Sequence, residues 1–179
     1  GWMLDIRRAA LENFSRMDWP TPQEEEWRRS DIGNYDFESY EFAGAARPEA
    51  PETEPPAGIA GSIEFDGPEC TGVSLSPDLA RRGVVFDSLE HLLKKVRAGE
   101  EVSEAAVSAL RRLLTETAAW DENRMYPFHY SAWTHGVLLY VPSSVLKEEP
   151  FVVSFSEGGN KHFSIPHVVG VVGSGADAT

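Results

Sequence analysis

The sequence contains a single cysteine, Cys70, among its 179 residues. One cysteine cannot form a disulfide within the chain, and it cannot build a metal site from cysteine ligands. The lack of a disulfide framework is typical of a reducing compartment, so we expect a cytoplasmic protein. Long apolar runs are missing as well, since none approaches the roughly 18–20 residues that a membrane-spanning helix requires.

Basic residues are also scarce. The chain has 16 Lys and Arg against 29 Asp and Glu, which gives a net charge of −13 and a pI near 4.7. This balance argues against electrostatic binding to nucleic acid or to an anionic membrane. The hydrophobic fraction of 41% is sufficient for a core, and the length suits one ordinary domain or two small ones.

Hydrophobic periodicity and turn residues divide the chain into four parts. These are an N-terminal helical region over 1–42, a Pro/Ala/Glu-rich linker over 43–61, a small α/β segment over 62–135 and a β-rich segment over 136–179. We expect helices over residues 2–17, 22–29, 89–97 and 103–115. We expect strands over residues 62–65, 72–75, 84–86, 137–141, 151–155 and 168–172. The sequence therefore predicts an α+β fold.

The last three strand candidates are nearly continuous apolar runs. Such runs are typical of strands that are covered on both faces. Their starting positions at 137, 151 and 168 follow no fixed period. The pattern therefore fits the first, irregular turns of a β-solenoid, and it fits a small sandwich sheet equally well.

The segment from Thr21 to Ile32 combines a helix start with an acidic turn. Thr21 and Glu24 have the spacing of a capping box, and Pro22 suits the first helical position, so a short helix is predicted from Pro22. Trp27 is interpreted as an anchor that pins this helix to the rest of its domain, with docking of a partner as the alternative. Arg28 or Arg29 is expected to bind the last helical carbonyls or to pair with Asp31.

Two stretches of the chain resemble one protein family. The run Glu25-Glu26-Trp27-Arg28-Arg29-Ser30-Asp31-Ile32 resembles the E-E-W-R-x-[ST]-D-[LI] signature of the SufB/SufD family, whose members are scaffold components of iron–sulfur cluster assembly. The run Gly136-Val137-Leu138-Leu139-Tyr140-Val141-Pro142, followed by Pro150-Phe151, resembles the G-x-x-[IL]-Y-V-P…P-[IF] pattern that begins the family's β-rich core. Glu25-Glu26-Trp27-Arg28 favours a SufD-like member, whereas Trp2-Met3-Leu4 is closer to a SufB-like start.

The resemblance implies a scaffold subunit that is not an enzyme. Its 136–179 segment would be the truncated start of a right-handed parallel β-helix, with further β-rich sequence expected beyond Thr179. The expected partners are a SufB/SufD-type subunit and a SufC-type ABC ATPase, and the iron–sulfur cluster belongs to the full complex. The family's cluster-handling residues lie later in the β-helix, so no catalytic, cofactor or metal residue is carried over. The motif residues Glu25, Glu26, Trp27, Arg28, Asp31, Gly136, Tyr140 and Pro142 are given structural or docking roles.

Two other classes of function remain open on the residues alone. The aromatic strip over 35–42, together with the acidic linker, suits a stand-alone interaction module. His129 and His135, with Glu157, are the candidate ligands of a small metal-dependent β-barrel enzyme. No histidine spacing places two ligands on one face of an element, so a hydrogen-bonded structural histidine is expected instead.

Overall fold

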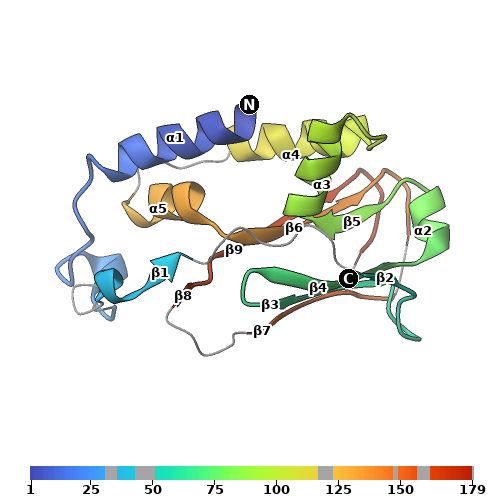
Figure 1. Cartoon of the computed structure of the whole chain (residues 1–179), viewed down its shortest axis with the longest axis horizontal. Coiled ribbons are helices and arrows are strands. Elements are labelled where there is room, and N and C mark those ends of the chain that lie inside the picture. Colours follow the sequence, from blue (N-terminus) through green and yellow to red (C-terminus); the bar gives the residue numbers. More distant parts are fainter. Residues whose placement is uncertain (31–35, 43–50, 117–122, 147–148, 157–161, 179) are drawn as a thin grey trace. The chain divides into compact units, whose positions relative to one another are not determined.

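A computed structural model describes residues 1–30, 36–42, 51–116, 123–146, 149–156 and 162–178. The helices are α1 (Trp2–Phe14), α2 (Pro77–Arg81), α3 (Leu89–Ala98), α4 (Glu104–Glu116) and α5 (Met125–Ala132). The strands are β1 (Glu41–Phe42), β2 (Glu52–Thr53), β3 (Gly61–Asp66), β4 (Glu69–Leu75), β5 (Val85–Ser88), β6 (His135–Val141), β7 (Phe151–Ser156), β8 (His162–Phe163) and β9 (Pro166–Val172). The predicted α+β class is confirmed (Figure 1).

The chain forms two compact units, each built from two separate stretches. The first combines Gly1–Glu41 with Arg111–Trp133, and the second combines Phe42–Leu110 with Thr134–Thr179. In the first unit α1 packs against α5 and buries Met3, Ile6 and Ala10. These residues lie three and four positions apart, so the predicted amphipathic helix is confirmed, although it ends at Phe14 rather than residue 17.

Arg7 ties α1 to the C-terminal end of α5 in the first unit. The Arg7 guanidinium donates hydrogen bonds to the Trp133 carbonyl at 2.8 Å and the Ser131 carbonyl at 3.3 Å. The same guanidinium lies 4.2 Å from the centroid of the Trp133 ring, which is a cation–π distance. Arg7 therefore satisfies carbonyls left open at the C-terminal end of α5 and covers the buried Trp133 ring.

The second unit contains two small sheets. One has the strand order β2-β4-β3-β7 and the other the order β5-β6-β9. The β3 and β4 strands form an antiparallel hairpin that turns at Gly67, whose φ of 55° lies in the left-handed region that favours glycine. By contrast, β7 runs parallel to β3, and β9 runs parallel to β6. Both sheets are therefore mixed, because each contains antiparallel and parallel pairs. The parallel pairs join strands that are far apart in sequence.

The core of this unit lies between the two sheets. Ile63 and Phe65 from β3 pack with Val73 from β4 against Phe86 from β5 and Val137 from β6, and all five are buried. The outer face of β6 is covered by α3. Ser88 caps α3, because its Oγ accepts from the His91 amide at 3.1 Å, and the helix ends at Gly99 with φ 71°.

Two sequence-based expectations need correction. The capping box does place Glu24 Oε1 2.8 Å from the Thr21 amide, yet only the 3₁₀ turn Glu25–Trp27 follows, not a helix over 22–29. The segment lacks an apolar stripe to bury, and a short helix without tertiary packing does not offset the cost of its first turn. The second correction concerns the last three strands, which were expected to be covered on both faces. β6 is largely buried, but exposed and less exposed residues alternate along β9, and the residues of β7 become exposed towards its end.

Candidate functional site

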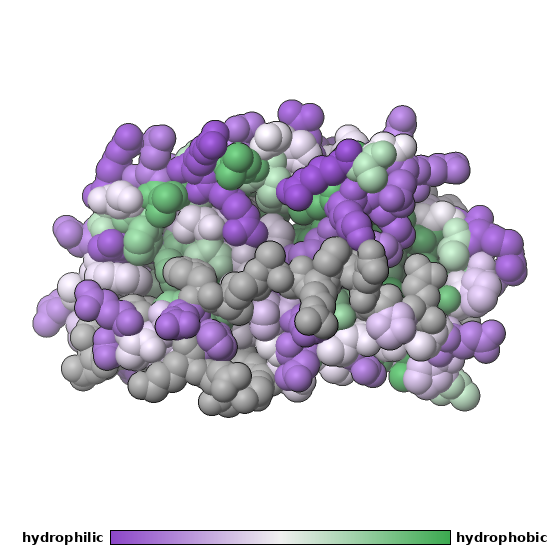
Figure 2. All heavy atoms as spheres, viewed as in Figure 1, coloured by the Kyte–Doolittle hydropathy of each residue, from purple (hydrophilic) through white to green (hydrophobic). Residues whose placement is uncertain are grey.

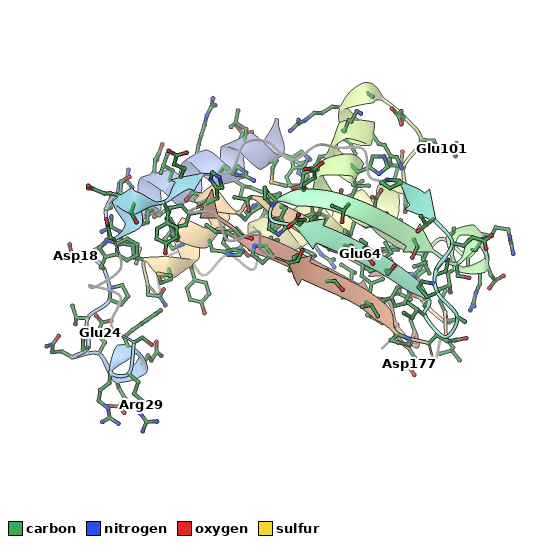
Figure 3. The ribbon with its side chains drawn as sticks, turned by 60° about the horizontal axis from the view of Figure 1, so that its bottom comes forward. Asp18, Glu24, Arg29, Glu64, Glu101 and Asp177 are labelled. Carbon is green, nitrogen blue, oxygen red and sulfur yellow. The ribbon has the colours of Figure 1, made fainter. Side chains whose placement is uncertain are left out.

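The first family motif lies on the surface of the first unit. Glu25 and Glu26 are exposed, and Arg28 pairs with Glu25 at 3.5 Å, with both side chains more than half exposed. Glu24 and Arg29 lie at the two ends of the turn (Figure 3), and the Glu24 carboxylate folds back onto the Thr21 amide. Trp27 is half-buried. Asp31, the expected partner of Arg28, lies outside the described residues. Exposed ion pairs of this kind contribute little to stability.

The second family motif lies at the centre of a parallel stack in the second unit. Each residue of β6 pairs with the residue 31 positions later in β9, from His135 with Pro166 to Val141 with Val172. The same offset continues past the strand ends, because Leu146 bridges Asp177 and the Thr134 amide donates to the Ile165 carbonyl at 2.9 Å. Residues 134–146 and 165–177 therefore run parallel and in step, and we call this pair of segments the parallel stack.

Gly136 is the point of closest approach in this stack. A Cβ atom built there would lie 2.6 Å from Leu89 Cδ1 and still closer to the His167 carbonyl oxygen. The first atom belongs to α3 on the outer face of β6, and the second belongs to the neighbouring strand. Only glycine lets a helix and a paired strand approach the same backbone position this closely.

Tyr140 and Pro142 occupy the end of the same strand. Tyr140 stands in register with Val85 of β5 and Val171 of β9. Pro142 begins the turn after β6, and this turn lies directly against Gly173, where a Cβ atom would come within 2.9 Å of the Pro142 carbonyl carbon. Gly136 and Pro142 thus lie where the two segments of the stack approach closely, Tyr140 pairs with both neighbouring strands, and we assign none of the three a chemical role.

His129 and His135, the two histidines named from the sequence as candidate ligands, belong to different units of the chain. His129 lies on α5 in the first unit, and burial lowers its pKa from 6.5. His135 begins β6 in the second unit, is fully buried and lies within hydrogen-bond distance of Thr134 Oγ1, at 2.8 Å from Nδ1. The hydrogen-bonded histidine expected at the start of this strand is confirmed. Glu157 lies outside the described residues.

Cys70 is a buried core residue on β4. Burial raises the pKa of its thiol to about 11, and the carboxylates of Asp87 and Glu90 add to the rise. A thiol that holds its proton this strongly is a poor nucleophile near neutral pH. Within the described ranges, no group of three or more His, Cys, Asp and Glu residues is placed to hold a metal ion.

A charged cluster that the sequence did not single out lies at the junction of β5 and α3. Asp87 is buried and accepts from the Ser88 amide at 2.8 Å, and its Oδ1 lies 3.0 Å from His91 Nδ1. Its other oxygen lies 3.6 Å from Lys95 Nζ. The signal was present as D-S-x-x-H-x-x-x-K, in which helical spacing places His91 and Lys95 on one face.

Comparisons with known proteins give no match for this chain. No family model matches it, and neither the curated proteins nor the solved structures contain a significant match. No helix within the described part of the chain is long and apolar enough to cross a membrane. In the view of Figure 2, hydrophilic side chains cover much of the visible surface.

Proposed function

We propose that this chain is the N-terminal part of a SufB/SufD-type scaffold subunit of iron–sulfur cluster assembly, with a SufD-like member favoured. The observation that carries the proposal is the parallel stack of residues 134–146 on residues 165–177 at a constant offset of 31 positions. The second family motif lies in its first layer, and Gly136 stands where only glycine fits. Such a stack is what the opening layers of a parallel β-helix require.

The edges of the two sheets support a continuing β-helix. The strands β7 and β9 each lie at one edge of their sheet, and neither contains Asp, Glu, Lys or Arg. Val168 and Val172 on β9 are 56% and 50% exposed, and Phe155 on β7 is 39% exposed. Natural edge strands are normally protected by charge, proline or a covering element. The two strands carry no charge and β9 has proline only at its first residue, Pro166, which supports a further layer of parallel strands such as the right-handed turn that the family builds.

In this proposal the described residues are structural and not catalytic. Gly136, Tyr140 and Pro142 hold the first layers of the β-helix, and the exposed turn Glu25–Trp27 with Arg28 is a surface for a partner subunit. The iron–sulfur cluster is the cargo of the assembled complex. A SufC-type ABC ATPase and a second SufB/SufD-type subunit are the partners, and the cytoplasm is the proposed compartment.

Affinity purification tests this proposal. The complete gene product is tagged in its native cells and purified under anaerobic conditions, and its partners are identified by mass spectrometry. We expect an ABC-type ATPase and a second SufB/SufD-type subunit in stoichiometric amounts. Depletion of the protein should also lower the activity of iron–sulfur enzymes. A folded, abundant bait that retains neither partner, with no loss of iron–sulfur enzyme activity on depletion, would refute the assignment.

A charge-reversed bait tests the partner surface in the same cells. Glu25→Lys with Glu26→Lys alters two exposed carboxylates, and Glu12→Lys with Glu116→Lys is a control with the same charge change elsewhere in the first unit. If the turn docks a partner, only the first bait loses it. Equal retention by both baits would restrict the motif to a structural role.

A further inference from the structure

In the first unit α1 packs along α5 (Figure 1), and three aromatic side chains meet near the C-terminal end of α1. Phe14 is the last residue of α1, Trp19 comes shortly after it, and Phe128 lies on α5. The centroids of the Phe14 and Trp19 rings are 5.7 Å apart at an interplanar angle of 79°, and the Phe128 centroid lies 5.5 Å from that of Phe14. The edge-to-face pair therefore forms a corner with half-buried apolar walls.

The guanidinium of Arg124 sits in this corner. Its Cζ lies 4.2 Å from the centroid of the Phe14 ring and 4.6 Å from that of the Trp19 ring, and both are cation–π distances. The backbone beside Arg124 is fixed as well, because Asn123 Oδ1 accepts a hydrogen bond from the Met125 amide at 3.0 Å at the start of α5. The two rings and the first turn of α5 thus hold the guanidinium in one place.

The Arg124 guanidinium has no acceptor among the residues that the structure describes. Its Nε is buried without a hydrogen bond, and no carboxylate pairs with the group, so the two Nη groups form its accessible side. Three other arginines of the same unit pair with glutamates at 4.0 Å or less, namely Arg16, Arg28 and Arg112. A half-buried charge without a partner costs free energy, and a planar fork of donors remains open to an external acceptor.

We propose that the Arg124 guanidinium binds a small monocarboxylate. The two oxygens of a carboxylate accept parallel hydrogen bonds from the two Nη groups of one guanidinium. One bound carboxylate offsets the one positive charge that the surrounding rings partly remove from water. A multiply charged anion fits less well, because the chain already carries a net charge of −13. The inference is independent of the scaffold role.

NMR on the isotope-labelled 179-residue chain provides the test. The Nε–H group of Arg124 is buried, so its resonance should be protected from exchange with water and should report on the guanidinium directly. The probes are acetate and benzoate, and chloride and phosphate at the same ionic strength are the comparisons. We expect both carboxylates, but not chloride, to give saturable shifts of the Arg124 Nε–H and Trp19 indole resonances. Equal shifts with chloride would refute a bound carboxylate, and tighter binding of phosphate would overturn the choice of anion.

Two substitutions at Arg124 locate the binding, followed through the Trp19 indole resonance. Arg124→Gln removes the charge, and Arg124→Lys keeps the charge but loses the planar fork, so we expect both to weaken benzoate at least about tenfold. Arg112→Gln is the matched control, because it removes an exposed arginine of the same unit that already pairs with Glu116. Circular dichroism establishes that each variant is folded, and Arg124→Lys carries the test if Arg124→Gln unfolds. Equal benzoate affinity in Arg124→Lys and Arg112→Gln would refute the site.

Two acids that precede Arg124 in the sequence, Asp121 and Glu122, provide a further control. Their joint substitution by Asn and Gln should change the benzoate affinity by no more than about twofold, since only long-range charge is removed. A gain of about tenfold or more would show that these carboxylates occupy the guanidinium in solution, and it would overturn the proposal.

Discussion

Substitution of Gly136 by alanine tests whether the parallel stack is as closely packed as described. The added methyl group would meet the His167 carbonyl of β9 and Leu89 Cδ1 of α3, the latter at 2.6 Å. The first atom is main chain in a paired strand, and Leu89 is fully buried, so neither yields without distortion of the ladder or of the core. Overpacking of this kind typically costs about 1–3 kcal/mol. Because both obstacles are fixed, we expect about 2–3 kcal/mol for Gly136→Ala.

The chain offers a matched control on the facing strand. Gly170 lies on β9 in the same ladder, paired with Leu139, and a Cβ atom there would have no heavy atom within 4 Å. Gly170→Ala makes the same chemical change without a clash, so its effect on the free energy of unfolding should stay within about 0.5 kcal/mol. The difference between the two variants isolates the close approach at Gly136.

Urea denaturation followed by two probes measures this difference. All five tryptophans fall within the ranges of the first unit, so their fluorescence reports on that unit, whereas hydrogen exchange at the β6 and β9 amides reports on the stack. Gly136→Ala should speed exchange at these amides by roughly 30-fold or more, which corresponds to about 2 kcal/mol. Equal exchange rates in Gly136→Ala and Gly170→Ala would refute the packing described for this strand.

Three further substitutions have defined outcomes. Arg7→Met should lower the unfolding free energy of the first unit by about 1.5–3 kcal/mol, because charge-assisted hydrogen bonds to the Trp133 and Ser131 carbonyls are lost. Arg8 is exposed, so Arg8→Met should have little effect on the same unfolding transition followed by tryptophan fluorescence. The pKa of Cys70 is raised from 9.0 to about 11 in the folded protein, so the contribution of this thiol to stability is complete below pH 9 and is lost as pH rises towards 11. Cys70→Ala should therefore flatten the curve of unfolding free energy against pH between pH 9 and 11. An unchanged slope would contradict the raised pKa. Ser88→Ala should cost about 1 kcal/mol in urea denaturation by removing the cap of α3, and a loss indistinguishable from that of the exposed Ser154→Ala would rule out this role.

Local sequence patterns predicted most elements of the second unit. The hairpin strands, the start of α3 at Ser88 and its end at Gly99 follow from alternation, capping and the left-handed preference of glycine. The charged cluster was not predicted, because Asp87, His91 and Lys95 resemble an ordinary solvated helix face until Asp87 is seen to be buried. The segment after Thr21 was predicted wrongly, because capping chemistry marks a helix start but does not supply the packing that a helix needs.

The sequence by itself determined the α+β class, the periods of the main helices and strands, and the acidic balance that argues against nucleic-acid binding. The helices and strands depend on residues within one turn or strand of one another, and the acidic balance depends on composition alone. Only the tertiary structure decided that β7 pairs with β3 across 90 positions, and that β9 stacks on β6 at an offset of 31. Such pairings depend on which apolar faces share a core and on how closely two backbones approach. Gly136 shows both contributions. The glycine is read from the sequence, but the close approach of Leu89 and His167 that requires it is seen only in the structure.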